Sequence, residues 1–132
     1  DKTISIFGWA FKKDTNDSRE SASIYLAKIL IENNIKVNVY DPMVSQKRIF
    51  NDLSQLGVKI NTKSLEVYKS SNEAVKSSLG IAICTEWDEF KNLDWELTYK
   101  LMGNNPYVFD GRNILNTNKL KEYGFNTYSI GK

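Results

Sequence analysis

Short apolar runs alternate with longer helical patterns along the whole chain, and this alternation limits the fold more than any other feature. Parallel strands need a crossover connection, usually a helix, so regular alternation predicts an α/β fold. The expected strands are Thr3–Phe7, Lys36–Tyr40, Ile81–Thr85, Tyr107–Phe109 and Phe125–Ile130, with Val58–Ile60 as a candidate for a further short strand. The sequence therefore predicts a Rossmann-like, doubly wound sheet that is largely parallel and flanked by helices.

Apolar residues at helical spacing predict where helices cover this sheet. The first helix is expected to begin near Asp17, whose carboxylate can cap it while Glu20 completes a capping box. Asn33-Asn34 is expected to end it, since Asn tolerates a left-handed backbone. The stripe expected to pack on the sheet is Ala22, Tyr25, Leu26, Ile29 and Leu30. Later helices are expected at Ser45–Leu53, Ser71–Ser77, Asp94–Met102 and Asn118–Tyr123.

The composition predicts that residues 1–132 form a single globular domain. The chain is 41% hydrophobic and 26% charged, and its apolar runs are far too short to span a bilayer. The net charge of +2 is spread along the sequence, whereas nucleic-acid-binding domains usually concentrate basic residues on one face. The chain has no histidine and only Cys84, so it lacks the usual metal ligands and cannot form an internal disulfide. We expect no metal, no nucleic-acid or membrane partner, and a cytoplasmic setting.

The turn after the first expected strand is the strongest candidate for a ligand site. A dinucleotide-binding turn needs three glycines, which let the backbone approach a pyrophosphate closely, and only Gly8 is present here. A self-sufficient NAD site is therefore not expected. The turn instead carries Lys12 and Lys13 near a helix N-terminus, which is a favourable place for an anion.

Arg19 lies in the region expected to form the first helical turn, where a cation opposes the helix dipole. Two interpretations therefore remain open for this residue. Arg19 serves an anionic ligand, or it pairs with a neighbouring carboxylate at Asp14, Asp17 or Glu20.

Asp41-Pro42 ends the second expected strand, where a Rossmann domain places the acid that binds ribose. Because the glycines are absent, a turn is the favoured interpretation. Pro42 cannot continue a strand ladder, and it restricts Asp41 to an extended conformation.

The segment after Ile81–Thr85 lies at the same edge of the expected sheet, where ligands bind in open α/β folds. Within it, Trp87 and Phe90 are expected to pack a helix onto the sheet, while Glu86 and Asp88 cap that helix. The strand itself contains Cys84 without a basic neighbour, which predicts a buried, unreactive thiol.

A third cluster follows Tyr107–Phe109, where Gly111 permits an unusual turn and Arg112 offers a planar fork suited to phosphate. In a parallel sheet Arg112 and Lys12 project from the same edge, so two cations are expected to converge there. The sequence contains no Ser/His/Asp arrangement, zinc spacing, P-loop or pair of catalytic carboxylates. It therefore predicts an anion-binding domain without catalytic residues.

Four separated blocks of this sequence resemble the C-terminal, UDP-binding domain of the UDP-glucose 6-dehydrogenases in order and spacing. They are Gly8–Thr15 with Arg19–Ser21, Tyr40–Pro42, Ile83–Trp87 and Phe109–Arg112. The resemblance implies an NAD-dependent oxidoreductase that oxidises UDP-glucose to UDP-glucuronate with two NAD molecules. It also implies that the catalytic residues and the NAD glycine motif lie in N-terminal and central domains of a homo-oligomeric enzyme, so that this fragment alone is inactive.

By the same resemblance, Phe11, Lys12 and Arg112 contact the UDP-sugar. Arg19 reaches the NAD that is bound mainly by the absent N-terminal domain. Asn113 departs from the pattern, since animal forms have a second Arg there.

Three other functions remain open at this point. Related UDP-N-acetylsugar and GDP-mannose dehydrogenases share the domain type. A stand-alone nucleotide-dependent enzyme would use Cys84 as its nucleophile, which requires an accessible thiol of low pKa. A receiver-like interaction module without a small-molecule ligand would make the charges from Lys12 to Arg19 ordinary surface charges.

Overall fold

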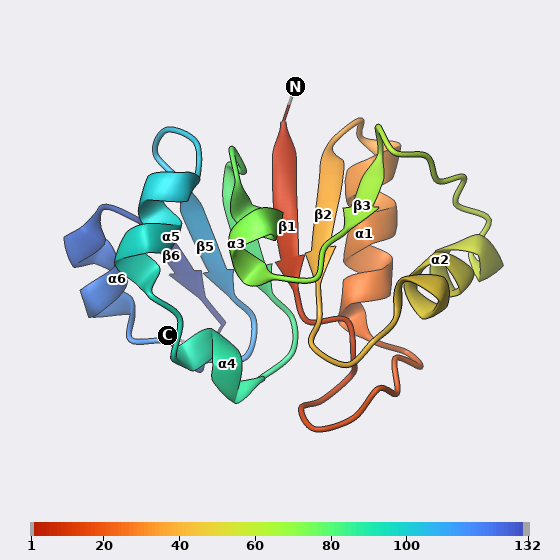
Figure 1. The fold of residues 1–132 in the computed structure, drawn as a ribbon, viewed down its shortest axis with the longest axis horizontal. Helices are drawn as coiled ribbons and strands as arrows, with labels where there is room; N and C mark the ends of the chain where they lie inside the picture. Colours follow the sequence, from red (N-terminus) through yellow and green to blue (C-terminus); the bar gives the residue numbers. More distant parts are fainter. Residues whose placement is uncertain (1, 131–132) are drawn as a thin grey trace.

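The computed structural model describes residues 2–130, which contain one sheet of six parallel strands (Figure 1). The strands are β1 (Thr3–Phe7), β2 (Lys36–Tyr40), β3 (Leu65–Val67), β4 (Gly80–Ile83), β5 (Tyr107–Asp110) and β6 (Asn126–Ser129), in the spatial order β3-β2-β1-β4-β5-β6. Because β1 pairs with both β2 and β4, the chain winds outward in two halves from a central strand. The predicted α/β, doubly wound fold is confirmed.

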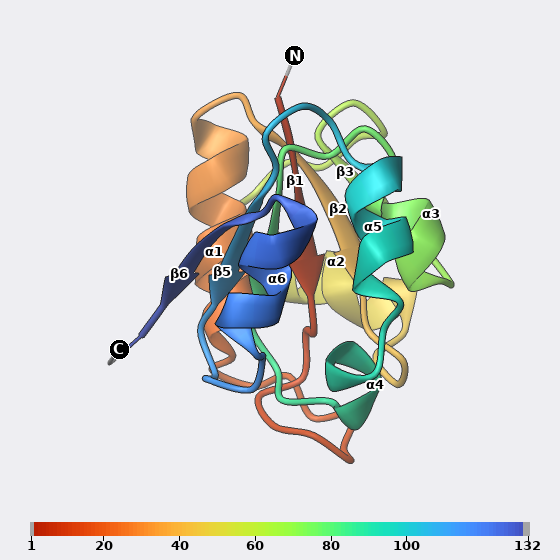
Figure 2. The same ribbon diagram turned by 90° about the vertical axis from the view of Figure 1, so that its left-hand side faces the viewer.

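Helices cover the two faces of the sheet unequally (Figure 2). The helices are α1 (Ala22–Glu32), α2 (Gln46–Gln55), α3 (Ser71–Val75), α4 (Asp88–Lys91), α5 (Trp95–Leu101) and α6 (Thr117–Tyr123). α1 lies on one side of the sheet with α2 packed against it, whereas α3, α5 and α6 lie on the other side. Right-handed crossovers that build outward in opposite directions from β1 produce this division. No helix within residues 2–130 is both long and apolar enough to cross a membrane.

The third strand forms later in the chain than predicted. The amide of Val58 donates a hydrogen bond to the Leu53 carbonyl (3.1 Å), which ties Val58 to the end of α2. A turn over residues 61–64 follows, closed by the Ser64 amide on the Asn61 carbonyl (3.0 Å). Hydrogen bonding to β2 therefore begins at Ser64, whose carbonyl accepts the Val37 amide (2.9 Å), and the predicted strand at Val58–Ile60 is wrong.

The start of α1 was also predicted wrongly. Ser21 caps the helix, with its hydroxyl accepting a hydrogen bond from the Ser23 amide (3.2 Å). Glu20 has φ 58, a left-handed conformation that stops the helix from beginning earlier. The Asp17 carboxylate instead accepts the backbone amide and guanidinium of Arg19. Local ion pairing therefore competes successfully with helix capping at Asp17.

The buried face of α1 matches the predicted stripe only at Leu26 and Leu30, which are partly buried and pack against the core. Ser23, Ile24 and Ala27 are the buried residues, whereas Tyr25 and Ile29 are 44% and 57% exposed. Apolar residues occur on almost every side of this helix, so their spacing alone does not identify the side that meets the sheet.

Aromatic packing joins the central strands to the helix that follows β4. Phe7 and Phe90 are fully buried, with ring centroids 5.0 Å apart, and Tyr40 meets both rings edge-on. Trp87 is also buried. The prediction that Trp87 and Phe90 pack a helix onto the sheet is confirmed. This packing fixes the loop after β4 beneath the carboxyl edge of the sheet.

Candidate functional site

The loops after β1 and β4 are in direct contact at the carboxyl edge of the sheet. Gly8 has φ 97, and a Cβ added to it would lie 2.3 Å from Thr85 Oγ1. The Thr85 hydroxyl donates to the Ala10 carbonyl (2.6 Å). Gly8 is therefore required for this close approach of the two loops.

Asp41 holds the loop after β1 in place. One carboxylate oxygen accepts the amides of Trp9 (2.7 Å) and Ala10 (3.0 Å) and the indole N–H of Trp87 (3.1 Å). The other oxygen accepts the amides of Met43 and Val44. The turn predicted at Asp41 is confirmed by this second oxygen. The first oxygen binds the loops after β1 and β4. Asp41 therefore joins three loops, because it lies itself at the end of β2.

This arrangement does not fit an NAD molecule at the first turn of the sheet. The amides of Trp9 and Ala10, which would face a pyrophosphate, donate to Asp41 instead. The Asp41 carboxylate, at the position of the ribose-binding acid, is already filled with five donors. Ala10 stands at the position of the second glycine, next to the buried indole of Trp9. These contacts give a physical reason for the prediction, made from the missing glycines, that this turn is not a self-sufficient NAD site.

Asp110 shapes the loop after β5 in a similar way. Its buried carboxylate accepts the amides of Arg112 (3.1 Å), Ile114 (2.9 Å) and Leu115 (2.8 Å). Asn113, inside the loop, has φ 57. The short loop is thus folded back tightly on the end of β5, which leaves Arg112 projecting from the edge.

Arg112 lies beside the loop that follows β1. Its Nη2 donates to the Phe11 carbonyl (3.3 Å) and to Glu86 Oε1 (2.7 Å). Burial raises the pKa of the Glu86 carboxyl, but hydrogen bonds from its own amide and from Arg112 outweigh burial, so the pKa lies below its ordinary value. Glu86 is thus an ionised partner of Arg112, and its prediction as a helix cap is wrong. The α4 helix is preceded by Trp87 without a side-chain cap.

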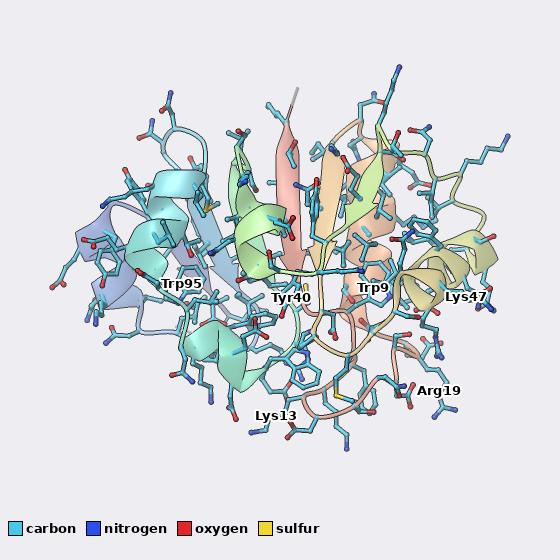
Figure 3. All side chains as sticks on the ribbon, in the orientation of Figure 1. Trp9, Lys13, Arg19, Tyr40, Lys47 and Trp95 are labelled. Carbon is cyan, nitrogen blue, oxygen red and sulfur yellow. The ribbon has the colours of Figure 1, made fainter. Side chains whose placement is uncertain are left out.

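The two lysines of the loop differ in their surroundings. The Lys13 amine lies 3.7 Å from Asp88, which also pairs with Lys91. The Lys12 amine lies 5.5 Å from the centroid of the Phe11 ring, and it pairs with no carboxylate within residues 2–130. Figure 3 shows Lys13 at the edge where the strands end. Among the residues that the structure describes, Lys12 is therefore the cation of this loop without a carboxylate partner.

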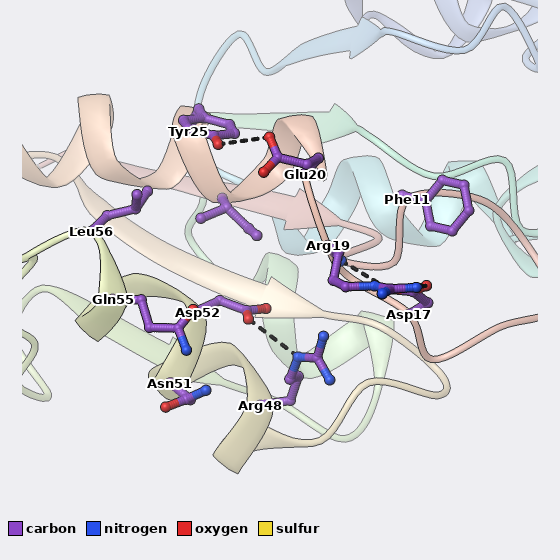
Figure 4. Close-up of a pocket in the computed structure, with 11 residues that line it drawn as sticks. Phe11, Asp17, Arg19, Glu20, Tyr25, Arg48, Asn51, Asp52, Gln55 and Leu56 are labelled. Atoms are coloured by element: carbon purple, nitrogen blue, oxygen red, sulfur yellow. Dashed lines mark hydrogen bonds and ion pairs between the residues drawn. The ribbon is translucent and has the colours of Figure 1, made fainter.

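Arg19 lies at a different place, in a cavity of about 920 Å³ between α1 and α2 (Figure 4). Its guanidinium donates to Asp17 at 2.8 Å, so the predicted ion pair is present, and the role of Arg19 toward a ligand stays a prediction. That hydrogen bond is the largest cause, and with the hydrogen bond from the Arg19 amide it lowers the pKa of Asp17 from 3.8 to about 2. The cavity lining includes Phe11 but neither Lys12 nor Arg112. The structure therefore brings Phe11, Lys12 and Arg112 together and sets Arg19 apart from the two cations, with Phe11 bordering both places.

A network around Asp52 was not predicted from the sequence. The Asp52 carboxylate, on α2, accepts the indole N–H of Trp9 (2.9 Å), the hydroxyl of Ser18 (2.5 Å) and Arg48 Nε (3.2 Å). It therefore anchors both ends of the exposed loop that carries Phe11 and Lys12. The only sequence signal was an acidic residue in an otherwise amphipathic helix, and that pattern normally indicates a solvent-exposed charge.

Cys84 does not have the character of a nucleophile. Burial raises the pKa of its thiol from 9.0 to about 12, which keeps the thiol protonated at neutral pH. The residue lies at the end of β4 beside the loop of Arg112. These properties support the prediction of an unreactive thiol. Within residues 2–130, no group of three or more His, Cys, Asp or Glu side chains could hold a metal ion.

The sequence is similar to a known family and to several of its members. A family model described as the UDP binding domain of the UDP-glucose/GDP-mannose dehydrogenase family matches residues 5–117. UDP-glucose 6-dehydrogenase 2 of Arabidopsis thaliana is 43% identical over 99% of the chain and 30% of its own length. The UDP-glucose 6-dehydrogenase of Gallus gallus is 42% identical over 100% of the chain and 28% of its own length. The chain thus spans less than one third of these relatives.

Solved structures support the same assignment of fold. An NDP-N-acetyl-D-galactosaminuronic acid dehydrogenase from Methanosarcina mazei has a TM-score of 0.80 at 23% identity, covering 99% of this chain and 25% of that one. A UDP-glucose dehydrogenase from Pyrobaculum islandicum has a TM-score of 0.68 at 24% identity, covering 96% of this chain and 24% of that one. With the family match and the identity to curated relatives, these likenesses leave one conclusion: the chain belongs to the UDP-glucose/GDP-mannose dehydrogenase family and corresponds to its UDP-binding domain.

Proposed function

We propose that residues 1–132 form the single, C-terminal UDP-sugar-binding domain of an NAD-dependent UDP-glucose 6-dehydrogenase. The whole enzyme would oxidise UDP-glucose to UDP-glucuronate with two NAD molecules, in the cytoplasm and as a homo-oligomer. The observation that carries the proposal is the meeting of Arg112 with the Phe11 carbonyl, 101 residues away in sequence. It joins the two loops that hold the proposed ligand residues at the edge where α/β sheets bind ligands.

The chemistry of these residues suits a nucleoside diphosphate. Both side-chain hydrogen bonds of Arg112 use Nη2, so Nε and Nη1 donate to no acceptor within the described residues. A guanidinium with free donors recognises phosphate or a nucleobase edge, and the Lys12 amine supplies a second positive charge. Glu86 orients Arg112 without covering it. Phe11 offers an exposed ring against which a flat or apolar part of the ligand can rest.

The domain contributes binding and not the chemical step. NAD supplies the hydride acceptor when it is bound, and the first turn of this sheet does not fit it. We propose that NAD is held mainly by the N-terminal domain of the enzyme and that Arg19, whose side chain is 80% exposed, contacts it from this domain. Breaking its ion pair with Asp17 would then accompany cofactor binding.

Lys12→Ala tests the proposed contact with phosphate. In the full-length enzyme we expect the Kd for UDP-glucose and for UDP to rise about tenfold, as loss of one charge-assisted hydrogen bond predicts. Binding of uridine, which lacks the phosphates, should stay within about twofold of wild type. Isothermal titration calorimetry measures all three ligands.

Lys13→Ala is the matched control, because it removes the same charge from the neighbouring position that already pairs with Asp88. It should change UDP affinity little. Equal losses for the two variants, or an unchanged affinity for UDP in Lys12→Ala, would contradict the role assigned to Lys12.

A further inference from the structure

The loop after β1 runs from Trp9 to Ser18 without helix or strand. Both of these residues are fully buried, whereas most of the residues between them are exposed. The amide of Phe11 donates to the Asp17 carbonyl (2.9 Å), which closes the loop on itself. Because an exposed loop with few buried contacts opens easily, its shape depends on the groups that hold its two ends.

Asp52 of α2 contacts both ends of this loop. One oxygen of its carboxylate, Oδ2, accepts the indole N–H of Trp9 (2.9 Å) and the hydroxyl of Ser18 (2.5 Å). The other oxygen accepts Arg48 Nε (3.2 Å), as Figure 4 shows. Within residues 2–130, no other side chain hydrogen-bonds to both Trp9 and Ser18. A single oxygen atom thus fixes the two ends of the loop relative to each other.

The two ends of the loop are supported unequally. At the first end, Asp41 also accepts the amides of Trp9 and Ala10. At the second end, the Ser18 hydroxyl has Asp52 as its one hydrogen-bond partner among the residues that the structure describes. Loss of Asp52 would therefore release the second end, while the first would still be held by Asp41.

The position of Lys12 depends on the shape of this loop. Its amine pairs with no carboxylate in the described part of the chain, so no ion pair of its own holds it in place. The carbonyl of the preceding residue, Phe11, accepts a hydrogen bond from Arg112 (3.3 Å). The loop backbone thus determines where the charge of Lys12 lies relative to the guanidinium of Arg112.

We propose that Asp52 is a positioning residue of the UDP-sugar site, and that it holds Lys12 where this lysine can act together with Arg112 on the diphosphate. The proposal rests on the proposed function. The Asp52 side chain is 8% exposed, and its carboxylate already accepts three donors. It therefore acts through the loop and not by touching the ligand. In this way α2 contributes to the affinity for a nucleotide that Asp52 does not contact.

Ser18→Ala tests the proposal with a small change. It removes the donor at the second end of the loop and leaves the hydrogen bond between Trp9 and Asp52 intact. In the full-length enzyme we expect the Kd for UDP to rise about fivefold, measured by isothermal titration calorimetry. Binding of uridine, which lacks the phosphates, should stay within about twofold of wild type. An unchanged Kd for UDP overturns the proposal.

A double-mutant cycle separates positioning from a general loss of structure. If Ser18 acts through Lys12, the two substitutions are not additive, because both weaken the same contact with phosphate. In a Lys12→Ala enzyme, Ser18→Ala should therefore change the Kd for UDP by less than about twofold. An equal fold-change with and without Lys12 overturns the proposal.

Arg48→Ala is the matched control, because it removes the third donor to the same carboxylate without altering the loop. It should leave the Kd for UDP within about twofold of wild type. A loss as large as that of Ser18→Ala would mean that the charge around Asp52, and not its hold on the loop, determines UDP affinity, and this result also overturns the proposal.

Asp52→Ala removes the acceptor that serves both ends of the loop. It should raise the Kd for UDP at least as much as Ser18→Ala does, and circular dichroism checks that the enzyme is folded. If Asp52→Ala does not fold, the Ser18→Ala measurements decide the question.

A failure of this inference is distinct from a failure of the proposed function. If Lys12→Ala leaves UDP binding unchanged, the role of Lys12 in the proposed function is wrong. If Lys12→Ala weakens UDP binding and Ser18→Ala does not, only the role assigned to Asp52 is wrong.

Discussion

At the scale of single residues, Asp41 and Asp110 act as clamps at the ends of β2 and β5. Each carboxylate is buried, and each accepts several amides of a loop that carries a proposed ligand residue or lies beside one. Glycines are the usual means of shaping a nucleotide loop, because they remove side chains from the path of the ligand. Here buried carboxylates shape the loops instead, and the loop can then carry large residues such as Trp9 and Phe11.

Asp41→Asn should loosen the loop after β1. An amide can accept with one oxygen only, so its NH2 group would face either the amides of Trp9 and Ala10 or those of Met43 and Val44. We expect a loss of about 2 to 4 kcal/mol in the free energy of unfolding, measured by urea denaturation. UDP affinity should fall as well, because Phe11 and Lys12 follow the displaced residues.

The matched control is Asp14→Asn, at an exposed position with φ 63 where Asn is well tolerated. It should change stability by less than about 0.5 kcal/mol. Similar losses in the two variants would show that net charge, and not the clamp, determines the effect.

The Asp17–Arg19 pair predicts how the stability of the domain depends on pH. The side-chain hydrogen bond from Arg19 lowers the pKa of Asp17 from 3.8 to about 2. Since the folded pKa is depressed, the stabilising contribution of the pair is present above about pH 3.8, and it is lost as the pH falls toward 2. An NMR titration should place the Asp17 midpoint near 2 in the wild type, and the midpoint should rise toward 3.8 in Arg19→Ala, which retains the hydrogen bond from the backbone amide of residue 19.

Arg48→Ala removes a cation that influences Asp17 only through the weaker coulombic interaction. The Asp17 midpoint should therefore move much less in this variant. A shift as large as that of Arg19→Ala would mean that general charge, and not the hydrogen bond, depresses the pKa.

At the scale of elements, the site depends on the close approach of the loops after β1 and β4. Gly8→Ala would place a Cβ 2.3 Å from Thr85 Oγ1 and 2.7 Å from the Thr85 backbone nitrogen, at φ 97. Because backbone cannot give way as a flexible side chain can, we expect destabilisation of about 2 to 5 kcal/mol in thermal or urea unfolding.

Gly57→Ala separates backbone strain from the overlap. Gly57 has φ 78 and nothing within 4 Å of the added Cβ, so the substitution should cost only about 1 kcal/mol. If Gly8→Ala is no worse than this control, the two loops are not as tightly joined as described.

The sequence predicted the bounds of helices and strands well where one hydrophobic period dominated. It predicted them poorly where local hydrogen bonds competed with the regular hydrogen bonds of a helix or strand. The strands β1 and β2 occur at the predicted residues, and the left-handed end of α1 occurs at Asn34. The start of α1 was wrong because Asp17 binds Arg19 in place of the helix amides. The predicted position of the third strand was wrong because the Val58 amide donates a hydrogen bond to the end of α2. Both errors arise from single hydrogen bonds that no periodic pattern contains.

At the scale of the whole molecule, the doubly wound sheet and the edge at which the site lies could be predicted from the alternation of elements. The convergence of Lys12 and Arg112 on one edge followed from parallel strands alone. The roles of Asp41, Asp52 and Glu86 could not be predicted, because each depends on which loops meet after the sheet has closed. The exposure of Tyr107, Phe109 and Tyr128 could not be predicted either, since an alternating strand normally buries its aromatic face.

The strand order also bears on how the protein forms while it is being made. β1 leaves the ribosome first, and its partner β2 follows about thirty residues later, so this half of the sheet can assemble early. β4, β5 and β6 then add outward one at a time, and the stacked, exposed rings of Tyr107, Phe109 and Tyr128 are complete only with the last strand. The exposed aromatic surface of the domain is therefore complete only after the rest of the sheet has emerged, which shortens the time during which it faces other nascent chains.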